Sequence, residues 1–430
     1  MRSRFRWIRY PVYNFPMVSS SFSRRGFLGG ATAAAWTARS WAQTAGANNK
    51  LRVGIIGCGG MATGHLGNLV KMKESDNIEL VAFCDLFDKR AQKFADFAKE
   101  KAGATAKLFK DYHALLADKD VDYVLIATPE HWHAQMTIDA ALAGKHVYCE
   151  KPMTLNVEQA KKVVATVKKT GIKMQVGVQG MSDESYQVAN QYIKEGYIGK
   201  VLLAQIDYSR NSKEPDHMYT KEDPDASASS VEWNTWLGGA PKRAFDKDRY
   251  FHWRRFWDYS SGIASDLFIH RVTRIIKSCG LTFPERGVGT GGKFCWPDAI
   301  GDVPDTLNFL LDYPEGMTVQ LVSSMGNATA IDHMIRGHKG TIHFTPTGFI
   351  IKPERIFASE VKEVVYEKKG SENTLLHHRN LQAAIRSGAE LNCPVDLGYY
   401  GVVAAQIGSM SYRQRKYMMW DKAKERIVKA

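Results

Sequence analysis

Three ionisable residues, Lys151, Asp266 and His270, together provide the groups that the oxidation of an alcohol requires. Lys151 follows Glu150 at the end of a short apolar segment, and a partly buried lysine can polarise a hydroxyl group or pass a proton. Asp266 and His270 are four residues apart, so a helix would place them on one face. A histidine that a carboxylate orients is suited to act as a general base. The structural alternatives are an exposed lysine in a loop and an Asp–His pair that stabilises a helix.

A glycine-rich segment follows the apolar run 51–56, and a helical pattern follows the segment in turn. The segment consists of Gly57, Cys58, Gly59, Gly60, Met61 and Ala62. Gly57 permits a tight turn, Gly59 lets the backbone approach a pyrophosphate, and Ala62 permits close packing of the helix. The free N–H groups at the start of that helix would bind phosphates. This pattern predicts a dinucleotide-binding turn.

The acid that such a turn requires is Asp85, at the end of the apolar segment 78–84. Asp85 lies 23 residues after Ala62, close to the offset at which a carboxylate binds the ribose hydroxyls. A carboxylate there would repel a 2′-phosphate. We therefore expect NAD as the cofactor, and NADP is the less favoured alternative.

The pattern of strands and helices changes near residue 179. Before it, unbroken apolar strands alternate with amphipathic helices, which implies a parallel sheet with both faces covered, the α/β doubly wound Rossmann fold. After it, short strands with few helices predict an α+β domain with a mainly antiparallel sheet. We therefore expect a signal peptide at 1–45, an NAD-binding domain at 50–178, and a substrate and oligomerisation domain at 179–430.

The first residues are typical of a twin-arginine export signal. Arg24 and Arg25 precede a short stretch rich in Gly and Ala, and Ser40 and Ala42 are small residues that suit cleavage. We expect the twin-arginine machinery to export the protein to the periplasm or beyond. No apolar run approaches the roughly 18–20 residues of a membrane-spanning helix.

Much of the positive charge lies in this predicted signal. Of the net charge of +13, seven charges are arginines before Ala42, which leaves +6 on the mature chain. No basic stripe with interleaved aromatic residues is present, so we expect no nucleic-acid partner.

Together these motifs resemble the Gfo/Idh/MocA family, named for glucose–fructose oxidoreductase, inositol dehydrogenase and a rhizopine-catabolism protein. The resemblance covers about residues 50–430 and is carried by the glycine turn and the segments 127–133, 150–152 and 262–270. It implies that Lys151 lies at both cofactor and substrate, and that Asp266 and His270 face a sugar, with His270 as the acid/base. It also implies a second set of residues near the nicotinamide half of the cofactor. These are Thr128, Pro129 and His133, and Glu150 and Lys151 are further candidate cofactor-binding residues.

The predicted location bears on the reaction. An exported enzyme has no free pool of nicotinamide, so we expect tightly bound NAD(H) and a carbohydrate substrate. One route returns the hydride to a second substrate. The alternative is an NAD-dependent glycoside hydrolase that oxidises the ring transiently and needs a second base, with Tyr219, His252 and Tyr259 as candidates. A non-catalytic sugar-binding protein is a third alternative, and the intact Lys151, Asp266 and His270 argue against it.

Two further features leave alternatives open. The aromatic residues within 209–261 could stack on sugar faces or pack a subunit interface, and we expect a homo-oligomer, a dimer or tetramer. His131, His133, His377 and His378 could suggest a metal site. No third ligand has suitable spacing, so we expect no metal.

Overall fold

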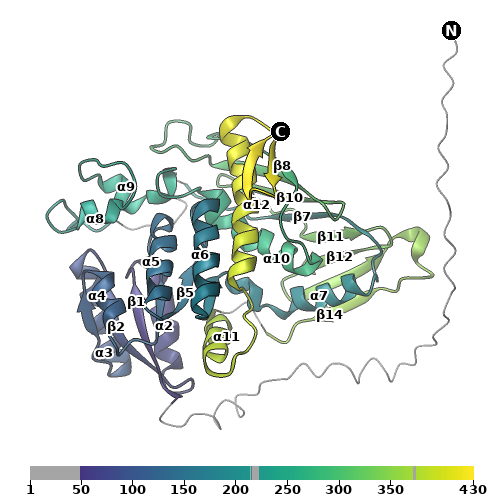
Figure 1. The fold of residues 1–430 in the computed structure, drawn as a ribbon. Helices are drawn as coiled ribbons and strands as arrows, with labels where there is room; N and C mark the ends of the chain where they lie inside the picture. The colour runs from purple at the N-terminus through teal and green to yellow at the C-terminus, as the bar shows by residue number, and fades with distance from the viewer. Residues whose placement is uncertain (1–48, 214, 216–221, 371–373) are drawn as a thin grey trace. The chain divides into compact units, whose positions relative to one another are not determined.

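The computed structural model describes residues 49–213, 215, 222–370 and 374–430 (Figure 1). The predicted export signal and Tyr219 lie outside the described residues. Within the described part of the chain, no helix combines the length and apolar character needed to cross a membrane.

The first sheet consists of parallel strands in the order β3-β2-β1-β4-β5-β6. Its strands are β1 (Leu51–Ile56), β2 (Ile78–Cys84), β3 (Lys107–Phe109), β4 (Tyr123–Ile126), β5 (His146–Glu150) and β6 (Met174–Gly177). Its helices are α2 (Gly60–Met72), α3 (Asp88–Ala102), α4 (Tyr112–Ala117), α5 (Glu130–Leu142) and α6 (Val157–Thr170). Helices α2 and α3 pack on one face together with α11 (Thr374–Ser387), and α4, α5 and α6 cover the other face.

Local sequence signals explain where several of these helices begin and end. The Asn156 side chain accepts a hydrogen bond from the Gln159 N–H and caps the start of α6. Gly103 and Gly171 end α3 and α6 in the left-handed conformation that glycine adopts without strain. The parallel strands and the helices between them agree with the prediction, so the predicted Rossmann fold is confirmed.

The second sheet has the order β14-β13-β12-β11-β7-β10-β9-β8-β15-β16. Its pairs are antiparallel except for β7 with β10, which confirms the predicted α+β character. The strands are β7 (Val201–Asp207), β8 (Arg286–Gly292), β9 (Thr306–Tyr313), β10 (Met317–Ser324), β11 (Met334–Gly337), β12 (Gly340–Thr345), β13 (Gly348–Pro353), β14 (Val364–Glu367), β15 (Met418–Asp421) and β16 (Arg426–Lys429).

Three helices pack with this sheet. They are α7 (Glu184–Lys194), α10 (Ile269–Cys279) and α12 (Val395–Gln414). Helix α12 lies against β8 on one side and against α6 of the Rossmann sheet on the other, as its place beside α6 in Figure 1 shows. The two sheets therefore share a continuous core through α12.

The helical segment that carries Asp266 and His270 contains two types of helix. Residues Ile263–Phe268 form a π-helix, and the α-helix α10 begins only at Ile269. Gly262, which precedes the π-helix, has φ +55°, and a Cβ there would overlap the Val303 side chain. A π-helix has i→i+5 hydrogen bonds, so each turn holds more residues than in an α-helix, and such turns are frequent at functional sites. Asp266 and His270 therefore lie on either side of a change in helix type.

The aromatic segment, defined here as residues 222–261, packs within the chain. It contains the short helices α8 (Trp233–Leu237) and α9 (Lys247–Phe251). Its buried rings are Trp233, Trp236, Tyr250, Phe251, Phe256 and Tyr259, and they form one cluster with Phe87 of the Rossmann domain. These rings are buried within the single chain, so packing inside the chain accounts for their burial.

Candidate active site

The glycine turn between β1 and α2 has the geometry of a phosphate cradle. Gly57 has φ +89°, and a Cβ there would lie 2.9 Å from backbone atoms of Ala127 and Thr128. Gly59 and Gly60 face open space, and no side chain caps the start of α2. Open space in front of free N–H groups at a helix N-terminus suits a pyrophosphate. The residues at this turn therefore fit a dinucleotide.

Asp85 is engaged with the backbone of the same turn. Its Oδ2 accepts a hydrogen bond from the Cys58 N–H at 2.8 Å, and its Oδ1 accepts one from the Phe87 N–H at 2.9 Å. Burial raises the pKa of Asp85, and the nearby Arg90 guanidinium opposes that rise. The carboxylate thus holds the turn in place, and its contact with a ribose stays a prediction.

A cavity of about 1010 Å³ runs from the glycine turn to the three predicted catalytic residues. Most of the predicted site residues line it, namely Gly59, Gly60, Met61, Thr128, Pro129, His133, Glu150, Lys151, Asp266 and His270. Gly57 and Asp85 line a neighbouring cavity of about 340 Å³, which also borders Thr128 and Pro129. Ala62 is fully buried in α2, as expected for a helix-packing position. Residues far apart in the sequence are thus brought to one connected region.

Lys151, Asp266 and Arg254 form an ion-pair cluster in the wall of this cavity. The Lys151 Nζ lies 2.6 Å from Asp266 Oδ1 and 3.0 Å from the Asp266 carbonyl oxygen. Arg254 Nε donates to the same Oδ1 at 3.2 Å. Burial alone would raise the pKa of Asp266, but the charges of Lys151 and Arg254 outweigh it and hold that pKa well below its usual range. Asp266 therefore stays ionised and fixes the ammonium group of Lys151. Sequence reasoning missed Arg254, although it lies only 12 residues before Asp266.

His270 faces the cavity as an uncharged imidazole. Burial lowers its pKa well below the usual value, and Lys151 and Arg274 lower it further. Its ring packs edge-on to the Tyr208 ring at a centroid distance of 5.8 Å. Between the described side chains of Asp266 and His270 there is no hydrogen bond, since Asp266 Oδ1 contacts Lys151 and Arg254 instead. The expected orienting contact from Asp266 to His270 is therefore absent from the described side chains, because Lys151 and Arg254 engage Asp266.

A buried polar network lies behind Glu150. His65 Nε2 contacts Glu150 Oε1 at 2.8 Å, and His65 Nδ1 contacts His378 Nε2 at 2.8 Å. Gln179 donates to the same Glu150 oxygen at 2.9 Å. Burial would raise the pKa of Glu150, but the hydrogen bond and charge of His65 outweigh it and lower that pKa. His65 was missed by sequence reasoning because its partners lie 85 and 313 residues away.

The histidines considered as metal ligands have other partners. His133 contacts the Thr128 and Pro152 carbonyl oxygens at 2.9 and 2.7 Å, so it holds together the two loops that border the cavity. His131 Nε2 contacts the carbonyl oxygen of Trp236 at 2.8 Å. The prediction that His133 touches the cofactor is not tested, and its ring nitrogens are already engaged.

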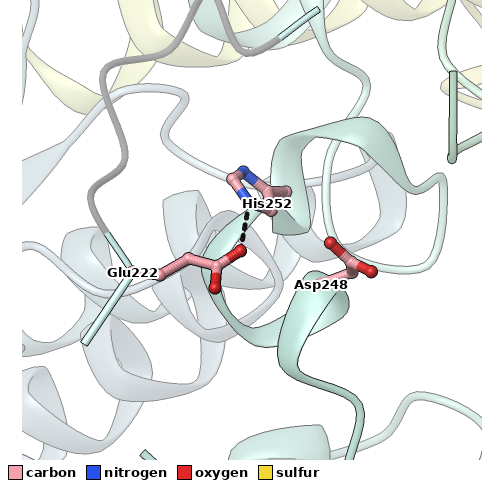
Figure 2. A group of neighbouring side chains, drawn as sticks. All are labelled: Glu222, Asp248 and His252. Atoms are coloured by element: carbon pink, nitrogen blue, oxygen red, sulfur yellow. Dashed lines mark hydrogen bonds and ion pairs between the residues drawn. The ribbon is translucent and has the colours of Figure 1, made fainter. Parts of the chain in front are cut away.

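A separate group of possible ligands comprises Glu222, Asp248 and His252 in the aromatic segment (Figure 2). Their ligand atoms lie within 4.8 Å of one another. His252 Nε2 lies 3.1 Å from Glu222 Oε1, and Lys247 Nζ lies 3.8 Å from the other Glu222 oxygen. A histidine and a lysine beside the same carboxylate form an ordinary charge network. The prediction of no metal stays untested.

The aromatic segment covers the carboxyl edge of the Rossmann sheet. Trp132 Nε1 donates to the Trp236 carbonyl at 2.8 Å, and the Ser260 hydroxyl donates to Glu130 at 2.7 Å. Arg90 lies over the Tyr250 ring at 5.2 Å. Trp236 and Tyr250 also line the smaller cavity beside Asp85. The segment thus covers the place where a bound dinucleotide would lie.

Comparison with known proteins agrees with this geometry. Residues 51–178 match the model of the Gfo/Idh/MocA family, described as an oxidoreductase family with an NAD-binding Rossmann fold. Inositol 2-dehydrogenase of Salmonella typhimurium is 33% identical over 168 residues, which are 39% of this chain and 48% of that protein. Myo-inositol 2-dehydrogenase of Thermotoga maritima is 33% identical over 156 residues, 36% of this chain and 44% of that protein. The chain thus matches about half the length of these curated relatives.

Solved structures extend the similarity of fold to the second domain. Levoglucosan dehydrogenase, in complex with NADH and levoglucosan, has a TM-score of 0.66 at 19% identity, covering 87% of this chain and 100% of its own. The WlbA dehydrogenase of Bordetella pertussis, in complex with NADH and UDP-GlcNAcA, has a TM-score of 0.62 at 19% identity, covering 86% of this chain and 98% of its own.

Residues 51–178 thus match the NAD-binding Rossmann fold of an oxidoreductase family, and a second, mainly antiparallel sheet follows them in the chain. The similarity to the Gfo/Idh/MocA family agrees with the resemblance that the sequence motifs predict, and residues 51–178 carry it.

Proposed function

We propose that the protein is an exported oxidoreductase that oxidises a hydroxyl group of a sugar or sugar derivative with tightly held NAD(H). The observation that carries this proposal is the meeting of Lys151, Asp266 and His270 at one end of the cavity that begins at the glycine turn. The inositol dehydrogenases among its relatives support a polyhydroxylated substrate. NADH in the neighbouring structures and the carboxylate of Asp85 support NAD over NADP.

The side chains at this end of the cavity divide the proton chemistry between them. A nicotinamide bound there supplies the acceptor for the hydride. His270, uncharged at neutral pH, takes the proton from the substrate hydroxyl as the C–H bond breaks. The Lys151 ammonium stabilises the negative charge that develops on that oxygen, and Asp266 holds the ammonium in position.

Tight retention of the cofactor is supported by the aromatic segment. Its cluster of buried rings and its hydrogen bonds to Trp132 and Glu130 close over the carboxyl edge of the Rossmann sheet. We expect the aromatic segment to slow the release of a dinucleotide bound below it. The proposal includes export by the twin-arginine machinery to the periplasm, return of the hydride to a second substrate, and assembly as a dimer or tetramer.

Glycoside hydrolysis has less support. Of the second bases that the structure describes, Tyr259 is fully buried in the aromatic cluster and His252 contacts Glu222, and neither lines the large cavity. Hydrolysis is therefore not part of the proposal.

The proposal is tested by adding sugars to the purified full-length protein without free NAD and following absorbance at 340 nm. We expect a single burst of NADH that an added keto-sugar reverses. A protein that binds NAD but gives no burst with any inositol, hexose or anhydrosugar would contradict the proposal.

A further inference from the structure

Tyr208 lies at the end of the large cavity that holds His270, and its side chain lines that cavity. The residue directly follows strand β7. Its N–H donates to the Val322 carbonyl oxygen at 3.1 Å, and the Ser323 hydroxyl donates to its own carbonyl oxygen at 2.8 Å. Both partners belong to β10, which pairs with β7. The pairing of these two strands therefore fixes the backbone of Tyr208 beside the cavity.

Two arginine side chains hold the Tyr208 ring. The Arg271 guanidinium carbon lies 4.5 Å from the centre of the ring, and that of Arg210 lies 5.1 Å from it. A guanidinium group over an aromatic face is attracted to the electrons of the ring. Because arginines already lie over the ring, we expect a bound molecule to meet the hydroxyl of Tyr208 and not the face of its ring.

Asp207 supplies a negative charge near Arg271. His333 Nε2 lies 2.6 Å from Asp207 Oδ1. Burial alone would raise the pKa of Asp207, but the hydrogen bond and charge of His333, with a smaller effect of the Arg271 charge, lower that pKa. Asp207 is therefore ionised at neutral pH. Arg271 thus belongs to a charge-balanced support for the Tyr208 ring.

The Tyr208 hydroxyl accepts one hydrogen bond and has a hydrogen of its own to donate. Arg210 Nη2 donates to the hydroxyl oxygen at 3.2 Å. None of the residues that the structure describes accepts the hydroxyl hydrogen of Tyr208. A phenolic hydroxyl both accepts and donates. Since the side chain lines the cavity, an oxygen atom of a molecule bound there can accept this hydrogen.

The same ring contacts the histidine that we propose as the base. The ring centres of Tyr208 and His270 lie 5.8 Å apart, and the two planes meet at 68°, which is an edge-on contact. A single bound molecule can therefore contact the Tyr208 hydroxyl and the His270 imidazole through oxygen atoms that are close to each other.

We propose that the sugar presents two neighbouring oxygens here, so that His270 takes the proton from one hydroxyl while the Tyr208 hydroxyl donates a hydrogen bond to the adjacent oxygen. Tyr208 thereby determines which ring hydroxyl meets His270 and Lys151. The substrate class is a sugar or polyol with an oxygen on the carbon next to the one that is oxidised. This inference rests on the proposed function and names the part of the substrate that the site recognises.

The test is a cycle between the protein and the substrate. Tyr208→Phe keeps the ring and removes the hydroxyl. The burst of NADH on the holoenzyme gives kcat/KM for glucose, myo-inositol and an anhydrosugar, and for the monodeoxy derivatives of the best of them. In the wild type, removing the oxygen that Tyr208 binds should lower kcat/KM by about tenfold, as for a lost hydrogen bond.

The variant should change the response to one position of the sugar alone. In Tyr208→Phe, kcat/KM for the parent sugar should fall by about tenfold, and removing the bound oxygen should then cost nothing further. Removing any other oxygen should cost the same factor in both proteins. A merely structural role of the hydroxyl would instead lower kcat/KM by one factor for every sugar, and that result would overturn the proposal.

Tyr417→Phe is the matched control. The Tyr417 hydroxyl donates to Asp312 at 3.4 Å and the Arg286 guanidinium carbon lies 6.0 Å from its ring centre, but Tyr417 lies outside the large cavity. This variant should match the wild type with every sugar. The nicotinamide content of both variants after purification should equal that of the wild type, because neither change touches the glycine turn.

A binding measurement separates this inference from the proposed function. Calorimetric titration of the NADH-loaded holoenzyme, which cannot oxidise a sugar, gives Kd for the same parent and deoxy sugars. If a sugar gives a burst but Tyr208→Phe responds to every position as the wild type does, the inference is wrong and the oxidoreductase stands. If the sugars bind with this dependence on Tyr208 but none gives a burst, the inference stands and the proposed function is wrong. Protein that binds none of these sugars would overturn both.

Discussion

The Lys151 ammonium nitrogen lies 2.6 Å from Oδ1 of Asp266, and this ion pair joins the end of β5 to the π-helix before α10. Both side chains are largely buried, at 9% and 8% exposure. Because one residue comes from the Rossmann domain and the other from the second domain, the contact sets the position of the lysine relative to the substrate end of the cavity. The proposed chemistry depends on this relationship.

Replacing Lys151 by Met should lower kcat about 100- to 1000-fold, the usual cost of removing a group that stabilises a developing oxyanion. Asp266 keeps its contact with Arg254, so the site is expected to fold. Stopped-flow measurement of the NADH burst checks this result. Lys151→Arg, which keeps the charge but changes its geometry, should recover only part of the loss. Wild-type kcat in Lys151→Met would contradict the assigned role.

Replacing His270 by Ala should abolish the burst of NADH, because proton removal from the hydroxyl then has no base. General-base catalysis typically contributes a factor of about 100 to 10,000. The nicotinamide content of the purified variant, measured after denaturation, should equal that of wild type, since His270 lies at the substrate end. A variant that retains the full burst rate would show that another group takes the proton.

Glu130 should make the protein less stable as pH rises. Burial and the charge of Asp266 raise its pKa from 4.5 to about 7. At a pH between these two pKa values, the folded state therefore still binds a proton that the unfolded state has released. The free energy of unfolding falls as pH rises through this range. Glu130→Gln should remove this loss, on the order of 3 kcal/mol at most.

Urea unfolding of wild type and Glu130→Gln at about pH 5 and pH 8 checks this prediction. We expect the variant to gain stability relative to wild type only at the higher pH. Glu100→Gln is the control, since Glu100 is exposed and pairs with Lys101 at the surface. An equal difference between variant and wild type at both pH values would mean that Glu130 does not titrate in this range.

Trp236 should govern retention of the cofactor. It is 5% exposed, stacks on Trp233 at 4.8 Å and lines the smaller cavity beside Asp85. Trp236→Ala should open the aromatic cluster and cost about 3–5 kcal/mol of stability. Bound nicotinamide after long dialysis should fall well below the wild-type amount. Trp257→Ala, a change in the same segment but outside the cluster, should leave it unchanged.

Local sequence patterns predicted much of the fold. Gly57, Gly59 and Asp85 placed the dinucleotide turn, because strand, turn and acid lie within a single continuous βαβ unit. The fold class followed from the change in strand pattern near residue 179. The short strand Lys107–Phe109 and the hairpin β15–β16 were missed, because their few residues carry little periodic signal.

The site was harder to predict wherever it depends on tertiary contacts. Lys151, Asp266 and His270 were identified from motifs, but a helical spacing of four could not reveal that Asp266 contacts Lys151 and Arg254 instead of His270. The contact between His65 and His378 spans 313 residues, and no sequence period encodes it. The aromatic segment likewise gave no sign that its rings would pack on Phe87.

The most direct test of the account is the state of the nicotinamide in the full-length protein purified from the periplasm without added cofactor. Denaturation should release close to one NAD(H) per chain, and adding a suitable sugar beforehand should convert the released NAD to NADH. Protein that arrives in the periplasm empty, or whose bound NAD no sugar reduces, would contradict the proposal of an exported oxidoreductase that retains its cofactor.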